Sequence, residues 1–437
     1  MQLMTACIVA ILVYSYILAA LSVTAKSRPA DSRAHHLRFI VLIPALNEED
    51  VIGLTLTSVL ASVGDYHIIV IDDASTDGTV DAVTPFLADD RVHLLTQPIE
   101  LARRGKGAAL NAGYAHLLQL GFDELSAADD LIVTVFDSDA RVAPDFFEHV
   151  SPYFEQANVA GVQSTVRMYN ARASLLSFWQ HVEFAMWGAV FCRGKNALGT
   201  ATLGGNGQCV RLSALDSLGA EPWQPSALTE DLDLSLRLLL NGWQMRFCPS
   251  VAVEQEAVTN LRRLVRQRGR WMQGHFVCWQ YLPRLLTSRL RWLAKIDLCV
   301  YLFMPAVFLP IGIFSLASWI QFGLHYGSWT GPSIVTWYLM GFGIAPLTAV
   351  AFYRTGRITV GRSIGHAHVF IFYSLVWFLA TAVAFWNVVA GRRSWTKTTR
   401  ARVVGESAVP ALSGPSGYGA QYRDPLHHEA DVGEARE

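Results

Sequence analysis

The sequence predicts an α/β fold with a mostly parallel sheet and flanking helices, joined to transmembrane and interfacial helices. Three short β-branched runs, FIVLI, HIIVI and LIVTVF, are separated by stretches of helical periodicity, an order typical of parallel strands. Long apolar runs lie on both sides of this region. Only 16% of the residues are charged, against about 25% in ordinary soluble domains, so part of the chain is expected in a membrane.

The first apolar run covers residues 3–24, and a bilayer core takes roughly 20 apolar residues to cross. A cleaved signal peptide is the alternative, but it would have a basic N-terminal region, and Met1 and Gln2 carry no charged side chain. Basic residues follow the run: Lys26, Arg28, Arg33 and Arg38. By the positive-inside rule, they predict a membrane-anchored protein whose middle region is cytoplasmic.

A second membrane region is expected at residues 293–391, with three runs at 296–322, 334–353 and 366–390. Pro305 and Pro310 within the first of them allow a kinked or re-entrant helix. Basic residues lie both between the last two runs and after the final one: Arg354, Arg357, Arg362, Arg392, Arg393, Lys397 and Arg400. Both groups favour the cytoplasm, but a final run that crosses the membrane once would place them on opposite sides. The side of the C-terminus therefore stays open. Residues 404–437 lack apolar periodicity and predict a disordered tail.

The polar middle divides into a cytoplasmic domain at residues 37–258 and interfacial helices at 259–290. A further amphipathic, aromatic stretch at residues 174–191 is also expected at the bilayer surface. In open α/β sheets, ligands bind beyond the carboxyl ends of the strands. The polar clusters of this chain all follow predicted strands or open the next helix, so we expect one shared site.

Candidate donor-binding residues follow the first two strands. Glu48 comes after FIVLI, and Asp72 and Asp73 end HIIVI, where carboxylates could accept hydrogen bonds from a base or a ribose. Helix capping and interaction with a helix dipole are the alternatives in these turns. Lys106 lies between two glycines at a predicted helix start, where a diphosphate could bind, although a solvated surface lysine is the alternative. The motifs GxxxxGK[ST] and GxGxxG are absent, which disfavours a P-loop and a dinucleotide oxidoreductase.

Asp137 and Asp139 follow the strand LIVTVF. Residues two apart in an extended chain project to the same side, and two such carboxylates repel each other unless a cation or hydrogen bonds intervene. Oxygen ligands suit Mg²⁺ or Mn²⁺, which commonly take one or two protein carboxylates and complete their shell with phosphates and water. An acidic loop entry without a metal is the alternative.

Glu230 and Asp231 follow Thr229 at the start of a predicted helix. They could favour the positive end of that helix, with Thr229 as its cap. Alternatively, a carboxylate here could act as a general base that deprotonates an acceptor hydroxyl. The helix dipole is expected to lower the pKa of such a base, leaving it ionised but weak.

The run QRGRW places Gln267, Arg268, Arg270 and Trp271 on one predicted helix. Arginines could stabilise charge on a leaving diphosphate, and a tryptophan ring could stack on a sugar. A basic amphipathic helix on the bilayer surface is the alternative. Elsewhere, a net charge of −1 offers no electrostatic case for nucleic acid, and six scattered cysteines predict neither a disulfide framework nor structural zinc.

Taken in order, these clusters resemble the membrane-bound family 2 glycosyltransferases, which include cellulose, chitin, hyaluronan and poly-N-acetylglucosamine synthases. The resemblance covers residues 38–280 closely and the membrane runs loosely. It rests on seven motifs: PALNEE, IDDASTDGT, RGKGAALNAG, FDSDA, LTEDLDLSLRLLLNGW, RQRGRW and WTKTTR. It implies a GT-A-type fold, a UDP-sugar donor and Mg²⁺ or Mn²⁺.

The resemblance also implies a role for each matched residue. Glu48 and Asp72 or Asp73 would hold the uracil and ribose, with Lys106 nearby. Asp137 would contact the nucleotide sugar and Asp139 would ligate the cation, while Asp231 would be the general base of an inverting transfer. The remaining residues would serve the diphosphate (Gln267, Arg268 and Arg270) and the acceptor (Trp271 and Glu230).

Three functions are consistent with these residues. The first is extension of a polysaccharide at the cytoplasmic face of the cell membrane, for which few spans would require oligomeric or secretion partners. The second is a single transfer to a lipid acceptor near the interfacial helices. The third is a non-catalytic membrane sugar-binding or transport protein. Retention of acidic residues at all the expected positions disfavours the third.

Overall fold

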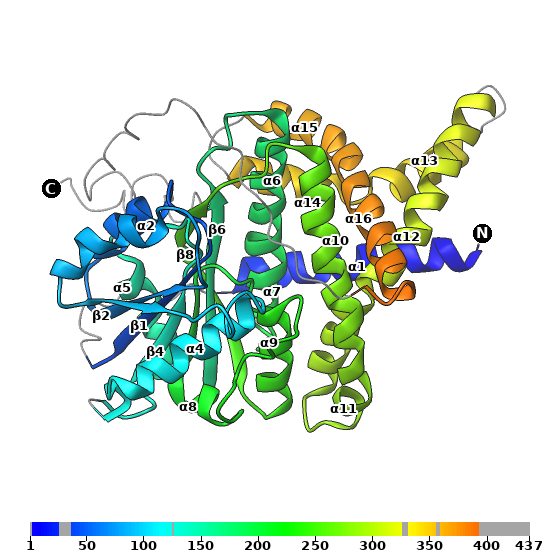
Figure 1. Cartoon of the computed structure of the whole chain (residues 1–437). Coiled ribbons are helices and arrows are strands. Elements are labelled where there is room, and N and C mark those ends of the chain that lie inside the picture. Colours follow the sequence, from blue (N-terminus) through cyan, green and yellow to red (C-terminus); the bar gives the residue numbers. More distant parts are fainter. Residues whose placement is uncertain (1, 26–35, 125, 326–330, 355–358, 393–437) are drawn as a thin grey trace, which may run out of the picture.

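The computed structural model describes residues 2–25, 36–124, 126–325, 331–354 and 359–392. The expected disordered tail at 404–437, the motif WTKTTR and the basic residues at 26, 28, 33 and 357 lie outside the described residues. Within them, an α/β domain lies on one side of a group of long helices (Figure 1).

All three predicted strands are present, and with one further strand they form the parallel half of an eight-stranded sheet of order β3-β2-β1-β4-β7-β6-β8-β5. The bounds of this half are β1 (Arg38–Ala45), β2 (Asp65–Asp72), β3 (Val92–Thr96) and β4 (Leu131–Val135). β1 pairs in parallel with both β2 and β4. The carboxyl ends of β1, β2 and β4 therefore meet at one edge, as the sequence predicts.

The other half makes the sheet mixed. It contains β5 (Arg141–Val142), β6 (Val159–Met168), β7 (Gln208–Arg211) and β8 (Gln244–Gln255). β7 runs antiparallel to β4 and β6, and β5 runs antiparallel to β8, whereas β6 and β8 are parallel. Apolar strand patterns do not encode the direction of pairing, so this half could not be read from the sequence.

Two cores cover the two faces of the sheet. Alternate residues of β1 enter different cores, because successive side chains of a strand point to opposite faces. Phe39 and Val41 pack with α2 (Ile52–Leu60) and α5 (Phe146–Val150), while Ile40 and Leu42 pack with α4 (Lys106–Gln119) and α9 (Glu230–Leu240).

Shorter helical elements connect these layers. They are α3 (Thr79–Val83), η1 (Thr84–Ala88), η2 (Phe122–Glu124), η3 (Ser151–Glu155), the π-helical turn η4 (Trp187–Cys192), α7 (Arg193–Lys195), α8 (Leu212–Asp216) and η5 (Trp279–Tyr281). The aromatic stretch 174–191 forms α6 (Leu175–Met186) and most of η4.

Three helical stretches among the described residues are long and apolar enough to cross a membrane: Thr5–Thr24, Trp292–Leu324 and Val360–Val389. They belong to α1 (Gln2–Thr24), to α12 (Trp292–His325) and to α15 (Val360–Tyr373) with α16 (Leu375–Val389). Pro305 and Pro310 lie within α12, which continues past both.

The expected span at 334–353 is not one helix. It is divided into α13 (Gly331–Phe342) and α14 (Ala345–Arg354), each too short to cross a bilayer core alone. The break lies beside Gly343, where an added Cβ would be 2.7 Å from the Leu12 side chain of α1. Glycine weakens a helix interior and here also admits a neighbouring helix, so hydropathy alone missed the division.

The QRGRW motif lies on α10 (Leu261–Cys278), which α11 (Leu282–Thr287) follows. α10 packs along α16 (Figure 1). The helices approach closely at Gly269, where an added Cβ would lie 3.3 Å from Val383 Cγ1 and 3.4 Å from the Ala380 carbonyl oxygen. The motif helix therefore connects the sheet domain to a candidate membrane helix.

Candidate active site

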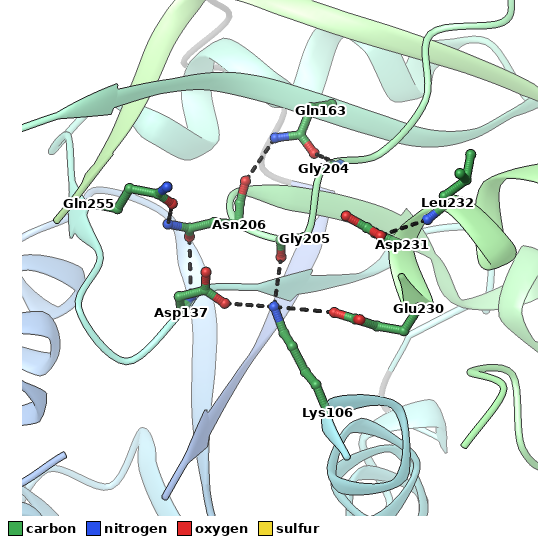
Figure 2. Close-up of polar contacts among 10 residues, drawn as sticks. All are labelled: Lys106, Asp137, Gln163, Gly204, Gly205, Asn206, Glu230, Asp231, Leu232 and Gln255. Atoms are coloured by element: carbon green, nitrogen blue, oxygen red, sulfur yellow. Dashed lines mark hydrogen bonds and ion pairs between the residues drawn. The ribbon is translucent and has the colours of Figure 1, made fainter. Parts of the chain in front are cut away.

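A lysine and two carboxylates from three elements form a charged cluster (Figure 2). The Lys106 Nζ lies 2.6 Å from Asp137 Oδ1 and 3.5 Å from Glu230 Oε1. Lys106 is the first residue of α4, Asp137 follows β4, and Glu230 is the first residue of α9. Gly105, at a φ of 110°, supplies the left-handed turn that starts α4. The cluster thus joins three motifs that the sequence analysis selected separately.

In this cluster the positive charge of Lys106 faces the carboxylates of Asp137 and Glu230. Burial lowers the pKa of Lys106, but the carboxylates of Asp137 and Glu230 outweigh this effect, and its pKa lies above the usual lysine range. Lys106 is therefore a permanent cation at neutral pH. Such a charge could contact a diphosphate once a ligand displaces part of the Asp137 interaction.

Asp231 lies beside the cluster, and its Oδ1 accepts a hydrogen bond from the Leu232 N–H at 2.8 Å. Burial and the neighbouring Glu230 carboxylate raise the pKa of Asp231 to about 7. The expectation that the helix dipole would lower this pKa is wrong, because desolvation and like-charge repulsion outweigh the Leu232 N–H and Lys106. A carboxylate with a pKa near the working pH is suited to general base catalysis.

A glycine-rich loop at residues 200–207, here called the glycine loop, closes over the cluster. The Lys106 Nζ donates to the Gly205 carbonyl oxygen at 3.4 Å. An added Cβ at Gly205 would lie 3.3 Å from Asp231 Oδ2, and φ there is 84°. Glycine is needed at this position for both its backbone conformation and the close approach.

Three polar residues that were not predicted from the sequence as site residues fix the end of this loop. Asn206 accepts a hydrogen bond from the Asp137 N–H at 3.1 Å and donates to Gln255 Oε1 at 2.9 Å. Gln163 accepts from the Gly204 N–H and donates to the Asn206 carbonyl oxygen (Figure 2). Glycines around Asn206 signalled a tight loop, but Gln163 lies within a strand and has no motif to mark it.

Asp139 lies in the same turn as Asp137, and its side chain is buried. Its Oδ2 accepts a hydrogen bond from the Glu256 N–H at 3.0 Å. Among the described residues, no group of three or more histidine, cysteine, aspartate or glutamate side chains is arranged to hold a metal ion. Two carboxylates nevertheless match the donor set of Mg²⁺ or Mn²⁺ bound jointly with phosphate oxygens.

The expected nucleotide-binding residues lie at the ends of β1 and β2, where the Asp73 N–H donates to the Ala45 carbonyl oxygen at 2.8 Å. Asp73 Oδ1 accepts hydrogen bonds from the Arg103 N–H and from Gln97 Nε2, and burial raises the pKa of Asp73. Asp72 accepts from the Ser75 N–H. Glu48 is buried as well, and its backbone N–H donates to Thr79 Oγ1.

Arg268 is engaged elsewhere. Its Nε lies 3.1 Å from Glu183 Oε1 on α6, and the same carboxylate accepts a hydrogen bond from the Tyr373 hydroxyl. Arg268 is 1% exposed and also donates to Gln267 Oε1 at 2.9 Å. We expected Arg268 and Gln267 to bind a diphosphate. In the structure, the Arg268 guanidinium instead binds a glutamate 85 positions away.

The Trp271 ring also belongs to this buried group. The Arg268 Cζ lies 3.9 Å from the ring centroid, and the rings of Phe184 and Trp377 are 6.2 and 6.3 Å away. The guanidinium therefore covers part of one ring face. Arg270 is half-exposed and, among the described residues, makes no ion pair, so it is the motif arginine whose charge remains available to a ligand.

α10 packs against the start of α9, next to the candidate base. An added Cβ at Gly274 would overlap the Thr229 side chain, and Thr229 precedes Glu230 and Asp231. The motif helix is therefore packed against the start of α9. Of the predicted residues, the structure brings together Lys106, Asp137, Glu230 and Asp231, and places Arg268 and Trp271 in the interface with the long helices.

The fold and the acidic cluster define a GT-A-like transferase domain. Residues 36–274 match the family model described as "Glycosyltransferase like family 2", and the chain belongs to this family. A mannosyltransferase from Pyrobaculum calidifontis, solved with GDP-Man and Mn²⁺, aligns over 88% of this chain and 98% of its own at a TM-score of 0.53 and 16% identity. That likeness concerns the fold.

Curated relatives include glycolipid and polysaccharide synthases. The chain is 35% identical to a β-monoglucosyldiacylglycerol synthase of Nostoc sp., over 54% of this chain and 48% of the relative. It is 26% identical to a poly-β-1,6-N-acetyl-D-glucosamine synthase of Staphylococcus epidermidis, over 57% and 58%. The chain thus spans about half the length of the curated relatives it matches. Within its described residues, the chain combines this family's domain with three candidate membrane helices.

Proposed function

We propose that the protein is an inverting glycosyltransferase that moves a hexose from a UDP-sugar to an acceptor at the membrane, with Asp231 as general base. The observation that carries this proposal is the position of the Asp231 carboxylate beside Glu230, the Lys106 cation and the glycine loop, where burial and Glu230 raise its pKa to about 7. A base with this pKa is partly ionised at neutral pH and still accepts a proton readily.

The reaction is a single displacement. The acceptor oxygen forms a bond to the anomeric carbon, the bond from that carbon to the diphosphate breaks, and the Asp231 carboxylate takes the hydroxyl proton. UDP leaves with the electron pair of the broken bond. Lys106 and Arg270 provide positive charge for the departing diphosphate.

On the donor side, Glu48, Asp72 and Asp73 supply acceptors for the uracil and ribose. Asp137 and Asp139 would hold Mg²⁺ or Mn²⁺, and the bound cation would offset negative charge on the diphosphate. The supporting observation is the donor set itself, two carboxylates following one strand. Lys106 neutralises Asp137 until the donor arrives.

We propose a lipid hydroxyl as the acceptor, with a growing polysaccharide as the alternative. Support comes from the relatives of 33–35% identity, which are named as glucosyldiacylglycerol synthases, and from the partial covering of Trp271 by Arg268. A polysaccharide acceptor is favoured by the QRGRW motif and by the poly-N-acetylglucosamine and glucomannan relatives. In either case Trp271 and Glu230 lie on the acceptor side.

The location follows from the long helices. The three candidate spans support an integral membrane protein, and the basic residues that follow the first span support a cytoplasmic catalytic domain. α10 and α11 would lie at the bilayer surface, with Arg262, Arg263 and Arg266 facing anionic headgroups.

The test is transfer by the purified full-length protein in liposomes, with UDP-glucose, UDP-N-acetylglucosamine, UDP-glucuronate or GDP-mannose. Diacylglycerol and oligosaccharides are offered as acceptors, and products are identified by mass spectrometry. One glycolipid is expected, whereas a ladder of oligomers would establish the polysaccharide alternative. Asp231→Asn should lose at least about 100-fold in transfer. UDP release that is unchanged in this variant would refute Asp231 as the base.

A further inference from the structure

A buried aspartate near the start of the membrane helix α12 takes no part in the chemistry above. Asp297 is 1% exposed and receives three donors. Lys195 Nζ and Thr200 Oγ1 lie 3.0 and 2.7 Å from its Oδ2, and the Tyr14 hydroxyl of α1 lies 2.6 Å from its Oδ1. A charged residue in a segment that can cross a membrane is costly and commonly functional.

The partners of Asp297 belong to three different parts of the fold. Tyr14 lies on the first long helix, Lys195 ends α7 of the sheet domain, and Thr200 opens the glycine loop. Lys195 also lies 4.2 Å from the centroid of the Tyr301 ring of α12. One carboxylate therefore joins both long helices to the segment that leads into the active site.

From Thr200 the chain passes directly to the catalytic cluster. Leu203 N–H donates to Ser235 Oγ at 3.0 Å, and Ser235 Oγ donates to the Asp231 carbonyl oxygen at 2.7 Å. Gly205 then contacts Lys106. The glycine loop is thus held by Asp297 at its first residue, by α9 in its middle and by Gln163 at its end.

We propose that Asp297 is a positioning residue for glycosyl transfer: through Thr200 it holds the glycine loop against the Asp231 carboxylate, so that the acceptor hydroxyl meets the base. This inference rests on the proposed function. Among the described residues, Asp297 contacts none of the expected donor residues, and it holds the loop at Thr200, at the other end from Gly205 and Asn206, which contact Lys106 and Asp137. We therefore expect Asp297 to affect acceptor use more than nucleotide binding. It also makes the geometry of the loop depend on a helix embedded in lipid.

The structure offers a matched pair of substitutions for a test. Thr200→Val removes the hydrogen bond between the loop and Asp297 and leaves the Lys195 ion pair in place. Tyr14→Phe removes one hydrogen bond to the same carboxylate from α1 and leaves the loop attached. Thr200→Ser keeps the hydroxyl and serves as the conservative variant. Each is prepared as the full chain in liposomes, with thermal unfolding as the check on folding.

Because a hydrogen bond to a charged group is lost, Thr200→Val is expected to lower kcat/KM for the acceptor about tenfold. Its affinity for UDP should stay within about twofold of the unmodified protein, since the nucleotide contacts are unchanged. Thr200→Ser and Tyr14→Phe are expected to transfer at near the unmodified rate. Equal losses in Thr200→Val and Tyr14→Phe would show that the network only stabilises the fold, and would overturn the inference.

Hydrogen exchange separates this inference from the proposed function. Faster amide exchange is expected in residues 200–207 of Thr200→Val and not of Tyr14→Phe, whichever reaction the protein catalyses. Suppose that exchange is faster in Thr200→Val but the unmodified protein transfers no sugar. This result would refute the proposed function and, with it, the acceptor role of the loop. Unchanged exchange and unchanged transfer in Thr200→Val would refute the inference alone. If Thr200→Val does not fold, Thr200→Ala is measured in its place.

Discussion

Replacing Lys106 by methionine tests the electrostatics of the site. The variant keeps a side chain of similar length and removes the cation that Asp137, Glu230 and Asp231 share. Because Lys106 lowers the pKa of Asp231, its loss should raise that pKa. General base catalysis needs the carboxylate, so activity at neutral pH should fall and the acidic limb of the pH profile should move upward.

The size of the shift follows from the geometry. An added Cβ at Gly205 would lie 3.3 Å from Asp231 Oδ2 and 3.5 Å from Lys106 Nζ, so the two charges are at most about 7 Å apart. With an effective dielectric constant of about 20, their attraction is about 2.4 kcal/mol or more, equivalent to ~1.8 pKa units. Starting from a pKa of about 7, the ionised fraction at pH 7 would fall from about one half to about 1.6%, a loss of ~30-fold.

The assay is kcat/KM for the donor between pH 5.5 and about 9.5, since this parameter reports the pKa values of the free enzyme. Activity of the unmodified protein should rise with pH through about 7, and that of Lys106→Met through nearly 9. Lys295→Met is the control, because the Lys295 Nζ donates to the Leu286 carbonyl oxygen, and no carboxylate of the cluster is its partner. An acidic limb at the same pH in Lys106→Met and Lys295→Met would refute the assignment of Asp231 and Lys106 as a coupled pair.

Three further predictions concern other parts of the site. Asp139→Ala should abolish Mn²⁺-dependent binding of UDP while the protein still folds, whereas Asp81→Ala, at an exposed position, should leave that binding unchanged; equal Mn²⁺ dependence in both variants would exclude Asp139 as a ligand. Arg268→Met should lower the free energy of unfolding by about 3–5 kcal/mol, measured by chemical denaturation, because Glu183 loses its buried partner. The double variant Arg268→Met/Glu183→Leu should recover most of this loss. An Arg268→Met variant as stable as the unmodified protein would contradict the prediction. Trp271→Ala should raise the KM for the acceptor with UDP affinity retained, and a collapse of UDP affinity would place Trp271 on the donor side instead.

Local patterns were sufficient to locate the charged cluster. β1, β2 and β4 were readable because each is a short apolar run ending in polar residues. Parallel neighbours end at the same edge, so Asp72 at the end of β2 and Asp137 after β4 had to lie at one edge of the sheet, on either side of β1. The helix starts at Lys106 and Glu230 completed the cluster, and both appear in the structure at the first residue of a helix.

Properties that depend on distant partners were not readable. The pKa of Asp231 was expected to fall and instead rises, because its burial and the orientation of Glu230 outweigh the helix dipole. The binding of Arg268 to Glu183 could not be seen either, since an arginine in a motif looks the same whether its partner is a diphosphate or a glutamate. Similarly, hydropathy at 334–353 predicted one span where Gly343 divides two helices.

By itself, then, the sequence determined the positions of β1, β2 and β4, the acidic and basic residues at the ends of strands and helices, and the family. These follow from periodicity and residue chemistry, which act over a few positions along the chain. Only the tertiary structure decided which charges neutralise each other, which carboxylate is desolvated, and how Asp297 of α12 connects to the glycine loop. Burial and pairing are set by atoms far apart in sequence, and electrostatic free energies depend on those distances and on the exclusion of water.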